Sequence, residues 1–174
     1  DYDKYFDSFD HELTEKLLRC GGIPDRLVTT WMDLITKVRK SVKVGSHIGD
    51  EVTHFNGLGQ GDPMSLLPAL LLTSLQFRHL AKRIPGLRMG AVVDDRNFRG
   101  SLDEILAAHH IVQKFDKAAG HFMQPEKTTF AAVNSYDRKR LAANNDLVTN
   151  GVKPNVVHHL VLVGDLISTQ NKLR

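Results

Sequence analysis

A short apolar run that ends in two adjacent aspartates constrains the fold of this chain more than any other feature. Residues 87–93 read as a strand that brings Asp94 and Asp95 to a tight turn, and residues 97–100 read as the returning strand. Helical patterns flank this strand-turn-strand on both sides. Such an order predicts an α+β fold, in which helices pack on one face of an antiparallel sheet.

The remaining segments alternate between helical and strand-like periodicity. The predicted helices cover about residues 10–21, 24–38, 64–83 and 101–119, with one more helical pattern after residue 136. A hairpin is predicted for residues 41–55, strands for residues 128–133 and 159–163, and a turn at Asn150-Gly151. No internal repeat or low-complexity linker divides the chain, so we expect a single domain.

Composition narrows the functional classes only slightly. The 174 residues are 41% hydrophobic and 25% charged, as in one ordinary globular domain. The net charge of +3 is compatible with a nucleic-acid partner, and the basic residues 37–43 could follow a phosphate backbone or form a solvated face. The longest apolar run, residues 66–75, is shorter than the roughly 20 residues of a membrane span. A single cysteine, Cys20, excludes a disulfide framework and fits a reducing compartment.

Asp1 and the Asp94-Asp95 pair are the carboxylates that could carry chemistry. Nucleotidyl transfer uses two metal ions about 3.5–4 Å apart, and hard cations prefer carboxylate oxygens. An Asp at the end of one strand and an Asp-Asp on a neighbouring strand-turn-strand can hold such ions, since adjacent strands lie about 4.8 Å apart. An isolated Asp-Asp pair is more often a solvated turn, so this interpretation depends on further motifs.

Five motifs occur in order along the chain. Residues 1–13 carry an Asp, four residues, a Phe-Asp, and then Asp-His and Leu. Residues 57–65 read Gly-Leu-Gly-Gln-Gly-Asp-Pro-Met-Ser, and residues 92–95 read Val-Val-Asp-Asp. Residues 124–128 read Gln-Pro-Glu-Lys-Thr, and residues 162–164 read Leu-Val-Gly. In the same order, these segments resemble the motifs of reverse transcriptases of the non-LTR retrotransposon and group II intron type.

This resemblance implies a polymerase palm with a ferredoxin- or RRM-like core over residues 1–174. It implies RNA-directed DNA polymerase activity, with two Mg²⁺ or Mn²⁺ ions held by Asp1, Asp94 and Asp95. Lys127 would lie near the phosphates and help the pyrophosphate leave. The expected partners are an RNA template, a DNA primer and deoxynucleoside triphosphates, without a membrane. The expected location is intracellular, and nuclear if the element is eukaryotic.

The resemblance also assigns residues to the nucleotide pocket. Phe6 would be a steric gate that rejects a 2′-hydroxyl, Gln60 would contact the nucleotide, and Gly61 would allow close backbone approach. Each has a simpler alternative, because Phe6 could be a core residue, Gln60 a loop amide and Lys127 a solvated charge. A ribonucleotide polymerase or nucleotidyl cyclase is a further alternative, against which Phe6 argues.

Three departures from the family pattern support a second hypothesis. Val92 replaces an aromatic residue, Gln124 replaces an Asn, and Leu66 stands where a Pro is usual after Ser65. A degenerate palm that binds RNA or a protein without catalysis would tolerate such changes.

The chain is also expected to be a piece of a longer protein. It begins without an initiator Met and without the features of a signal peptide. Fingers would precede Asp1 and a thumb would follow Arg174, so we expect the isolated piece to be weak or inactive.

Overall fold

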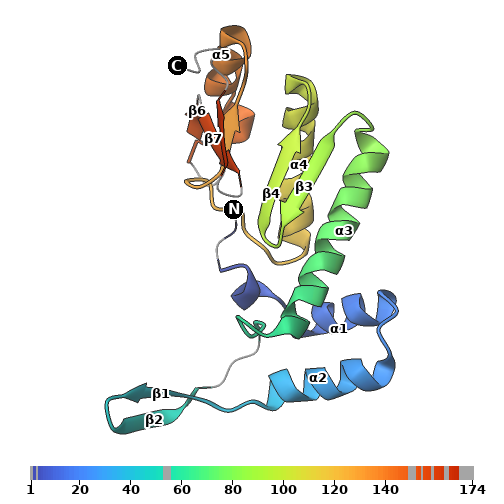
Figure 1. Ribbon diagram of the computed structural model, residues 1–174, viewed down its shortest axis with the longest axis vertical. Coiled ribbons are helices and arrows are strands. Elements are labelled where there is room, and N and C mark those ends of the chain that lie inside the picture. Colours follow the sequence, from blue (N-terminus) through green and yellow to red (C-terminus); the bar gives the residue numbers. More distant parts are fainter. Residues whose placement is uncertain are drawn as a thin grey trace.

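The order of helices and strands in the chain confirms the α+β class. The structure is a computed structural model that describes residues 2, 4–52, 56–148, 152–153, 155–157, 159–162 and 165–168. Its elements (Figure 1) are α1 (His11–Cys20), α2 (Asp25–Lys37), β1 (Lys40–Val44), β2 (His47–Val52), α3 (Leu66–Arg83), β3 (Arg88–Val92), β4 (Asp95–Arg99), α4 (Leu102–Ala118), β5 (Thr129–Ala131), α5 (Ser135–Ala143), β6 (Asn155–Val157), β7 (His159–Leu162) and β8 (Asp165–Ser168), with 3-10 turns at Phe6–Ser8, Pro63–Ser65 and Asn145–Leu147. The predicted turn at Asn150-Gly151 lies outside the described residues.

Local side-chain caps fix where the helices begin. The Asp10 carboxylate accepts a hydrogen bond from the backbone N–H of Leu13 (2.8 Å) at the start of α1. α4 begins with a capping box, in which the Ser101 hydroxyl accepts from the N–H of Glu104 and the Glu104 carboxylate accepts from the N–H of Ser101. Because these caps are short-range, the sequence predicts both helix starts correctly.

The strands pair differently from the single antiparallel sheet that the sequence suggested. Among the described residues they form four two-stranded sheets, of which β1–β2, β3–β4 and β7–β8 are antiparallel and β5–β6 is parallel. β5 and β6 run parallel because α5 connects them as a crossover. Tyr2 forms an isolated antiparallel bridge with Met123, outside these strands.

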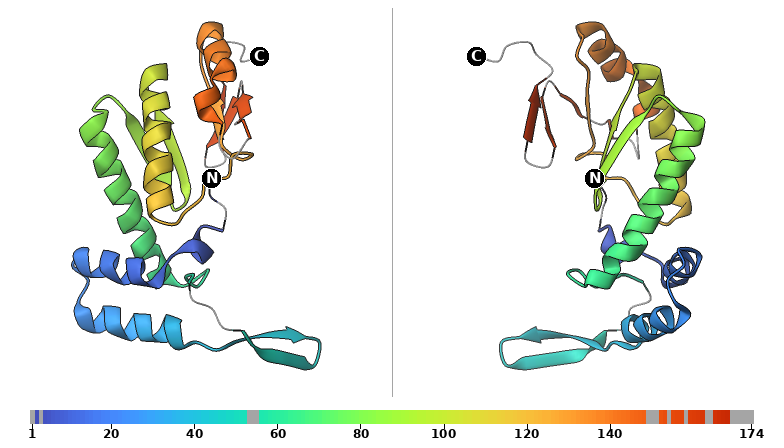
Figure 2. Two further views of the ribbon diagram at one scale, coloured as in Figure 1. Left: turned by 180° about the vertical axis from the view of Figure 1, so that it is seen from behind. Right: turned by 45° about the vertical axis from the view of Figure 1, so that its right-hand side comes forward.

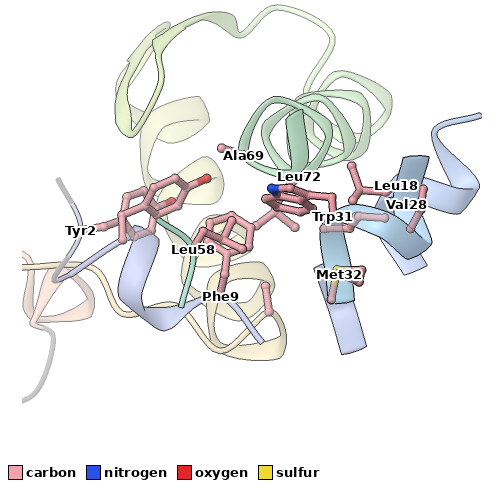
Figure 3. Packing of buried hydrophobic residues seen from close by; sticks show 12 residues of the cluster. Tyr2, Phe9, Leu18, Val28, Trp31, Met32, Leu58, Ala69 and Leu72 are labelled. Carbon is pink, nitrogen blue, oxygen red and sulfur yellow. The ribbon is translucent and has the colours of Figure 1, made fainter. Parts of the chain in front are cut away.

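Two apolar clusters form the core. The first joins the N-terminal segment, α1, α2 and the start of α3, and Figure 3 shows Trp31 beside Leu18 and Val28, with Phe9 and Leu58 toward Tyr2. The second cluster lies between α3, α4 and the β3–β4 hairpin, where its buried and partly buried members include Leu80, Ile84, Val112, Met89 and Phe98. Each fully buried aliphatic side chain contributes about 1.5–3 kcal/mol, so the second cluster holds the β3–β4 hairpin against α3 and α4.

The β1–β2 hairpin projects away from both clusters. Every residue of its two strands is exposed. Figures 1 and 2 show it extending beyond α2, whereas β3–β4 lies against α3 and α4. Helices therefore cover one face of the β3–β4 hairpin, as the sequence predicts for the strands around Asp94.

Candidate functional site

The Asp94-Asp95 pair lies at the tip of the β3–β4 hairpin. Val92 pairs with Asp95 across the hairpin, so Val93 and Asp94 form a two-residue turn and Asp95 already begins β4, earlier than the sequence predicted. The backbone φ of Val93 is +57°, a left-handed conformation that β-branched residues rarely adopt. Such a conformation costs about 1–3 kcal/mol and tends to occur at functional sites.

The two faces of this hairpin have different environments. Met89 and Phe98 point into the second core cluster. Val92 and Asp95 lie on the opposite, outer face, because side chains alternate along a strand, and both are exposed. Within the described part of the chain, the carboxylates of Asp94 and Asp95 have no hydrogen-bond or ion-pair partner. Two adjacent carboxylates without protein partners suit a hard divalent cation.

A buried group of polar side chains, which we call the Arg96 cluster, lies on the inner side of the hairpin. It comprises Tyr2, Gln76, Arg96 and Asp116. The Arg96 guanidinium pairs with the Asp116 carboxylate (Nη1–Oδ1, 3.3 Å), and both side chains are only 3% exposed. Asp116 also accepts from the Gln76 amide (2.8 Å) and from the Tyr2 hydroxyl (2.7 Å). Arg96 in turn donates to the Gln76 carbonyl oxygen (2.7 Å) and to the Tyr2 and Tyr5 hydroxyls.

The Arg96 cluster joins four segments that are distant in sequence. Tyr2 belongs to the N-terminal segment, Gln76 to α3, Arg96 to β4 and Asp116 to α4. The guanidinium also lies over the Tyr2 ring, 4.5 Å from its centroid. Since Arg96 directly follows Asp95, this cluster fixes the residue beside the aspartate pair against the segment that begins at Asp1.

Burial shifts the protonation equilibria of this cluster. Removal from water raises the pKa of the Asp116 carboxyl, although its hydrogen bonds and the Arg96 charge act in the opposite direction. Burial, and then the charge of Asp116, also raises the pKa of the Tyr2 phenol. Tyr2 therefore stays a hydroxyl donor at neutral pH.

His121 is a second buried polar residue near the same segment. Its ring packs against the rings of Tyr5 (5.0 Å) and Phe9 (4.6 Å). The Ser8 hydroxyl proton is donated to the Tyr5 carbonyl (2.8 Å), so His121 Nδ1–H donates to Ser8 Oγ (2.6 Å). Burial, and then the nearby charge of Arg96, lowers the pKa of His121 to about 4. The imidazole is thus neutral at pH 7.

The glycine-rich loop packs against the segment that carries Phe6. The N–H of Leu58 donates to the Phe6 carbonyl and the N–H of Gly57 to the Phe9 carbonyl, both at 2.8 Å. Gly57 has a φ of +97°, and a Cβ there would approach the Asp7 Cα to 3.3 Å. A larger residue would therefore separate the loop from this segment.

The expected nucleotide-pocket residues lie on these two segments. Phe6 is partly buried, with its ring edge-on to Tyr5 at 5.5 Å. Gln60 and Gly61 occupy an exposed turn, in which Gly61 has a φ of +86°. The next residue, Asp62, accepts a hydrogen bond from the Trp31 indole (2.8 Å), which ties the turn to α2.

Lys127 and Asp1 complete the set of residues assigned from the sequence. Lys127 lies in a turn closed by its N–H to the Gln124 carbonyl (3.2 Å), and its side chain is exposed. This turn follows Met123, which bridges to Tyr2. Asp1 lies outside the described residues, as do Val163 and Gly164 of the last motif, whose Leu162 ends β7. The structure thus brings the segments of four motifs together.

The sequence reasoning missed the Arg96 cluster and His121. One signal was present, because Asp116 falls four residues after Val112 on the apolar stripe of α4. A carboxylate at a buried helical position requires charged or hydrogen-bonding partners. Its partners, however, come from segments 20 to 114 residues away, and nothing local identifies them.

Within the described ranges, no three His, Cys, Asp or Glu side chains are grouped closely enough to hold a metal ion. Over the same ranges, no helix is both long and apolar enough to span a membrane. Comparison with protein-family models and with curated proteins identifies no matching family and no matching protein.

Proposed function

We propose that this chain is the palm part of an RNA-directed DNA polymerase. The observation that supports this most strongly is the Asp94-Asp95 turn, with its strained Val93 and two carboxylates free of protein partners among the described residues. The Arg96 cluster adds support, since it fastens the residue after this pair to Tyr2, the sequence neighbour of Asp1. These contacts suit a carboxylate site shared between the N-terminal segment and the hairpin.

The donor set fits divalent cations. Asp1, Asp94 and Asp95 would hold two Mg²⁺ or Mn²⁺ ions, which would supply activation of a primer 3′-hydroxyl and stabilisation of the leaving pyrophosphate. The protein's own contribution would be positional, because the buried Arg96–Asp116 pair and the core face of the hairpin hold the backbone that carries the two carboxylates.

The same proposal assigns the nucleotide contacts. The Phe6 ring would lie against the sugar and exclude a 2′-hydroxyl, and the loop attached to its backbone would present Gln60 and Gly61 to the incoming nucleotide. Lys127 would place a positive charge beside the triphosphate and help the pyrophosphate leave. RNA template, DNA primer and deoxynucleotide are the proposed substrates.

A metal titration tests this function even if the isolated chain synthesises little DNA. Calorimetry with Mn²⁺ should show a site in the native chain that Asp94→Asn and Asp95→Asn each weaken by at least tenfold. Asp50→Asn is the matched control, because Asp50 lies on the exposed β1–β2 hairpin. Equal Mn²⁺ binding in all four proteins would contradict the proposal. Primer extension on an RNA template, lost in Asp94→Asn, would then establish the reaction.

A degenerate palm that binds RNA or protein without catalysis is the second candidate. Val92 favours it, because this residue is 50% exposed beside Asp95 and supplies no ring to the outer face. This candidate predicts nucleic-acid or protein binding without any carboxylate-dependent Mn²⁺ site, so the same titration separates the two.

A further inference from the structure

Two arginines face each other at the other end of the β3–β4 hairpin. Arg88 and Arg99 are directly paired in the register, and both are exposed. Strand alternation places them on the outer face, together with Val92 and Asp95. Neither arginine has an ion-pair or hydrogen-bond partner within the part of the chain that the structure describes.

Like charges directly opposite each other destabilise an antiparallel pair. Glu104 is engaged in the capping box with Ser101, and Asp103 pairs with Arg140, so neither of these carboxylates neutralises Arg99. The pair therefore presents two unneutralised guanidinium groups on one surface. Guanidinium groups bind phosphate oxygens through two parallel hydrogen bonds, so an anionic phosphate ligand matches this arrangement.

Between the arginines and the turn, the outer face carries Gly90 and the side chain of Asn97. Gly90 pairs with Asn97, and a Cβ on Gly90 would lie only 3.1 Å from the Asn97 Nδ2. The Asn97 amide therefore lies over Gly90 and adds a hydrogen-bonding group between the arginines and Val92. A long ligand can lie along the hairpin from the arginines toward Asp95.

We infer that Arg88 and Arg99 bind backbone phosphates of a nucleic-acid duplex whose reacting end lies at the Asp94-Asp95 turn. The inference rests on the proposed polymerase function. Arg99 lies four positions after Asp95, about 13 Å along a strand at about 3.3 Å per residue. That length corresponds to about four phosphates along one strand of a duplex lying on this face. A polymer reaches both ends of the surface, whereas a small anion would contact only the arginine end.

Duplex binding in the absence of metal tests the inference. The probe is a fluorescein-labelled DNA primer annealed to an RNA template. Its affinity for the protein is measured by fluorescence anisotropy in EDTA over a series of KCl concentrations. Arg88→Gln/Arg99→Gln should bind at least tenfold more weakly at about 0.1 M salt, and the slope of log affinity against log salt should fall by about 1.8. The matched control, Arg78→Gln/Lys114→Gln, removes the same charge from exposed positions of α3 and α4, which cover the other face.

The control should stay within twofold of the native affinity. The inference would be overturned if the two double variants lost equal affinity, or if Arg88→Gln/Arg99→Gln bound the duplex as tightly as the native chain. It would also be overturned if the native chain bound no duplex, or bound anionic lipid vesicles instead. Relief of the like-charge repulsion should raise the melting temperature of Arg88→Gln/Arg99→Gln, so a folded variant is expected. Asp94→Asn should keep its duplex affinity, so a failed Mn²⁺ titration and a failed duplex measurement are distinguishable.

Discussion

Asp116 shows how one buried carboxylate can organise its surroundings. It accepts hydrogen bonds from Tyr2 and Gln76 and pairs with Arg96, so that protein groups satisfy both of its oxygens. Burial nevertheless raises its pKa, which shows that the charge is held at a cost. A residue in this position is expected to be sensitive to the loss of any single partner.

Breaking the Arg96–Asp116 pair should destabilise the fold strongly. Arg96→Met leaves Asp116 buried without its counter-charge and should lower the free energy of unfolding by about 3–5 kcal/mol in urea denaturation. The double variant Arg96→Met/Asp116→Leu should recover part of this loss, because no charge then remains buried. Arg140→Gln is the control, since it breaks the exposed Arg140–Asp103 pair (3.5 Å) and should change stability by less than about 1 kcal/mol. A loss in Arg96→Met as small as that of the control would show that the pair is not structural.

His121 should make stability depend on pH. Its folded-state pKa of about 4 lies below the usual value of 6.5, so the unfolded chain binds the proton more readily. The stabilisation is complete above about pH 6.5 and is lost as pH falls toward 4, with a slope of at most about 1.4 kcal/mol per pH unit. His109, whose pKa is also lowered by burial, acts in the same direction.

Urea denaturation at pH 7 and pH 5 measures this effect. The native chain should lose stability at pH 5, and His121→Asn, which keeps a donor for the Ser8 hydroxyl, should lose less. His47→Asn on the exposed β1–β2 hairpin should retain the full dependence. An unchanged pH dependence in His121→Asn would mean that His121 titrates normally in the folded state.

The β3–β4 hairpin carries buried residues on one face and exposed charged residues on the other. Its inner face carries Met89, Arg96 and Phe98 into the protein, whereas its outer face carries Asp95 and the Arg88–Arg99 pair. The turn between the strands is strained at a valine rather than relaxed at a glycine. Strain at that position is consistent with a turn whose geometry serves binding rather than stability.

Val93→Gly should therefore stabilise the protein. Glycine adopts a φ of +57° without steric penalty, and the relief of about 1–3 kcal/mol exceeds the extra chain entropy of about 0.5–1 kcal/mol. The melting temperature should rise, while Mn²⁺ affinity falls as the aspartates become less fixed. Val44→Gly in β1 has no strain to relieve and should not raise the melting temperature. A lower melting temperature for Val93→Gly would contradict the account of strain.

At the scale of the whole molecule, stability is distributed unevenly. Two core clusters hold the helices and the β3–β4 hairpin, whereas both strands of the β1–β2 hairpin are exposed over their full length. A hairpin without a packed face is only marginally stable in water. The chain should therefore open first at this hairpin.

Limited proteolysis checks this order. Trypsin should cleave after Lys40 or Lys43 before it cleaves after Arg96, whose side chain is buried against Asp116. Mass spectrometry of the first fragments identifies the sites. Early cleavage after Arg96, with the hairpin intact, would show that the hairpin is more stable than its exposure suggests.

The sequence by itself determined the helices, the two hairpins before residue 101 and the place of the aspartate pair beside the second turn, but not β6 or β8. Helix starts at Asp10 and Ser101 follow from caps within three residues, and the strand-turn-strand around Asp94 follows from local periodicity. Only the tertiary structure decided how the strands divide into four pairs and that Arg96 meets Asp116 and Tyr2. Caps and turns depend on neighbours in the chain, whereas a buried ion pair depends on desolvation that arises only when distant segments pack together.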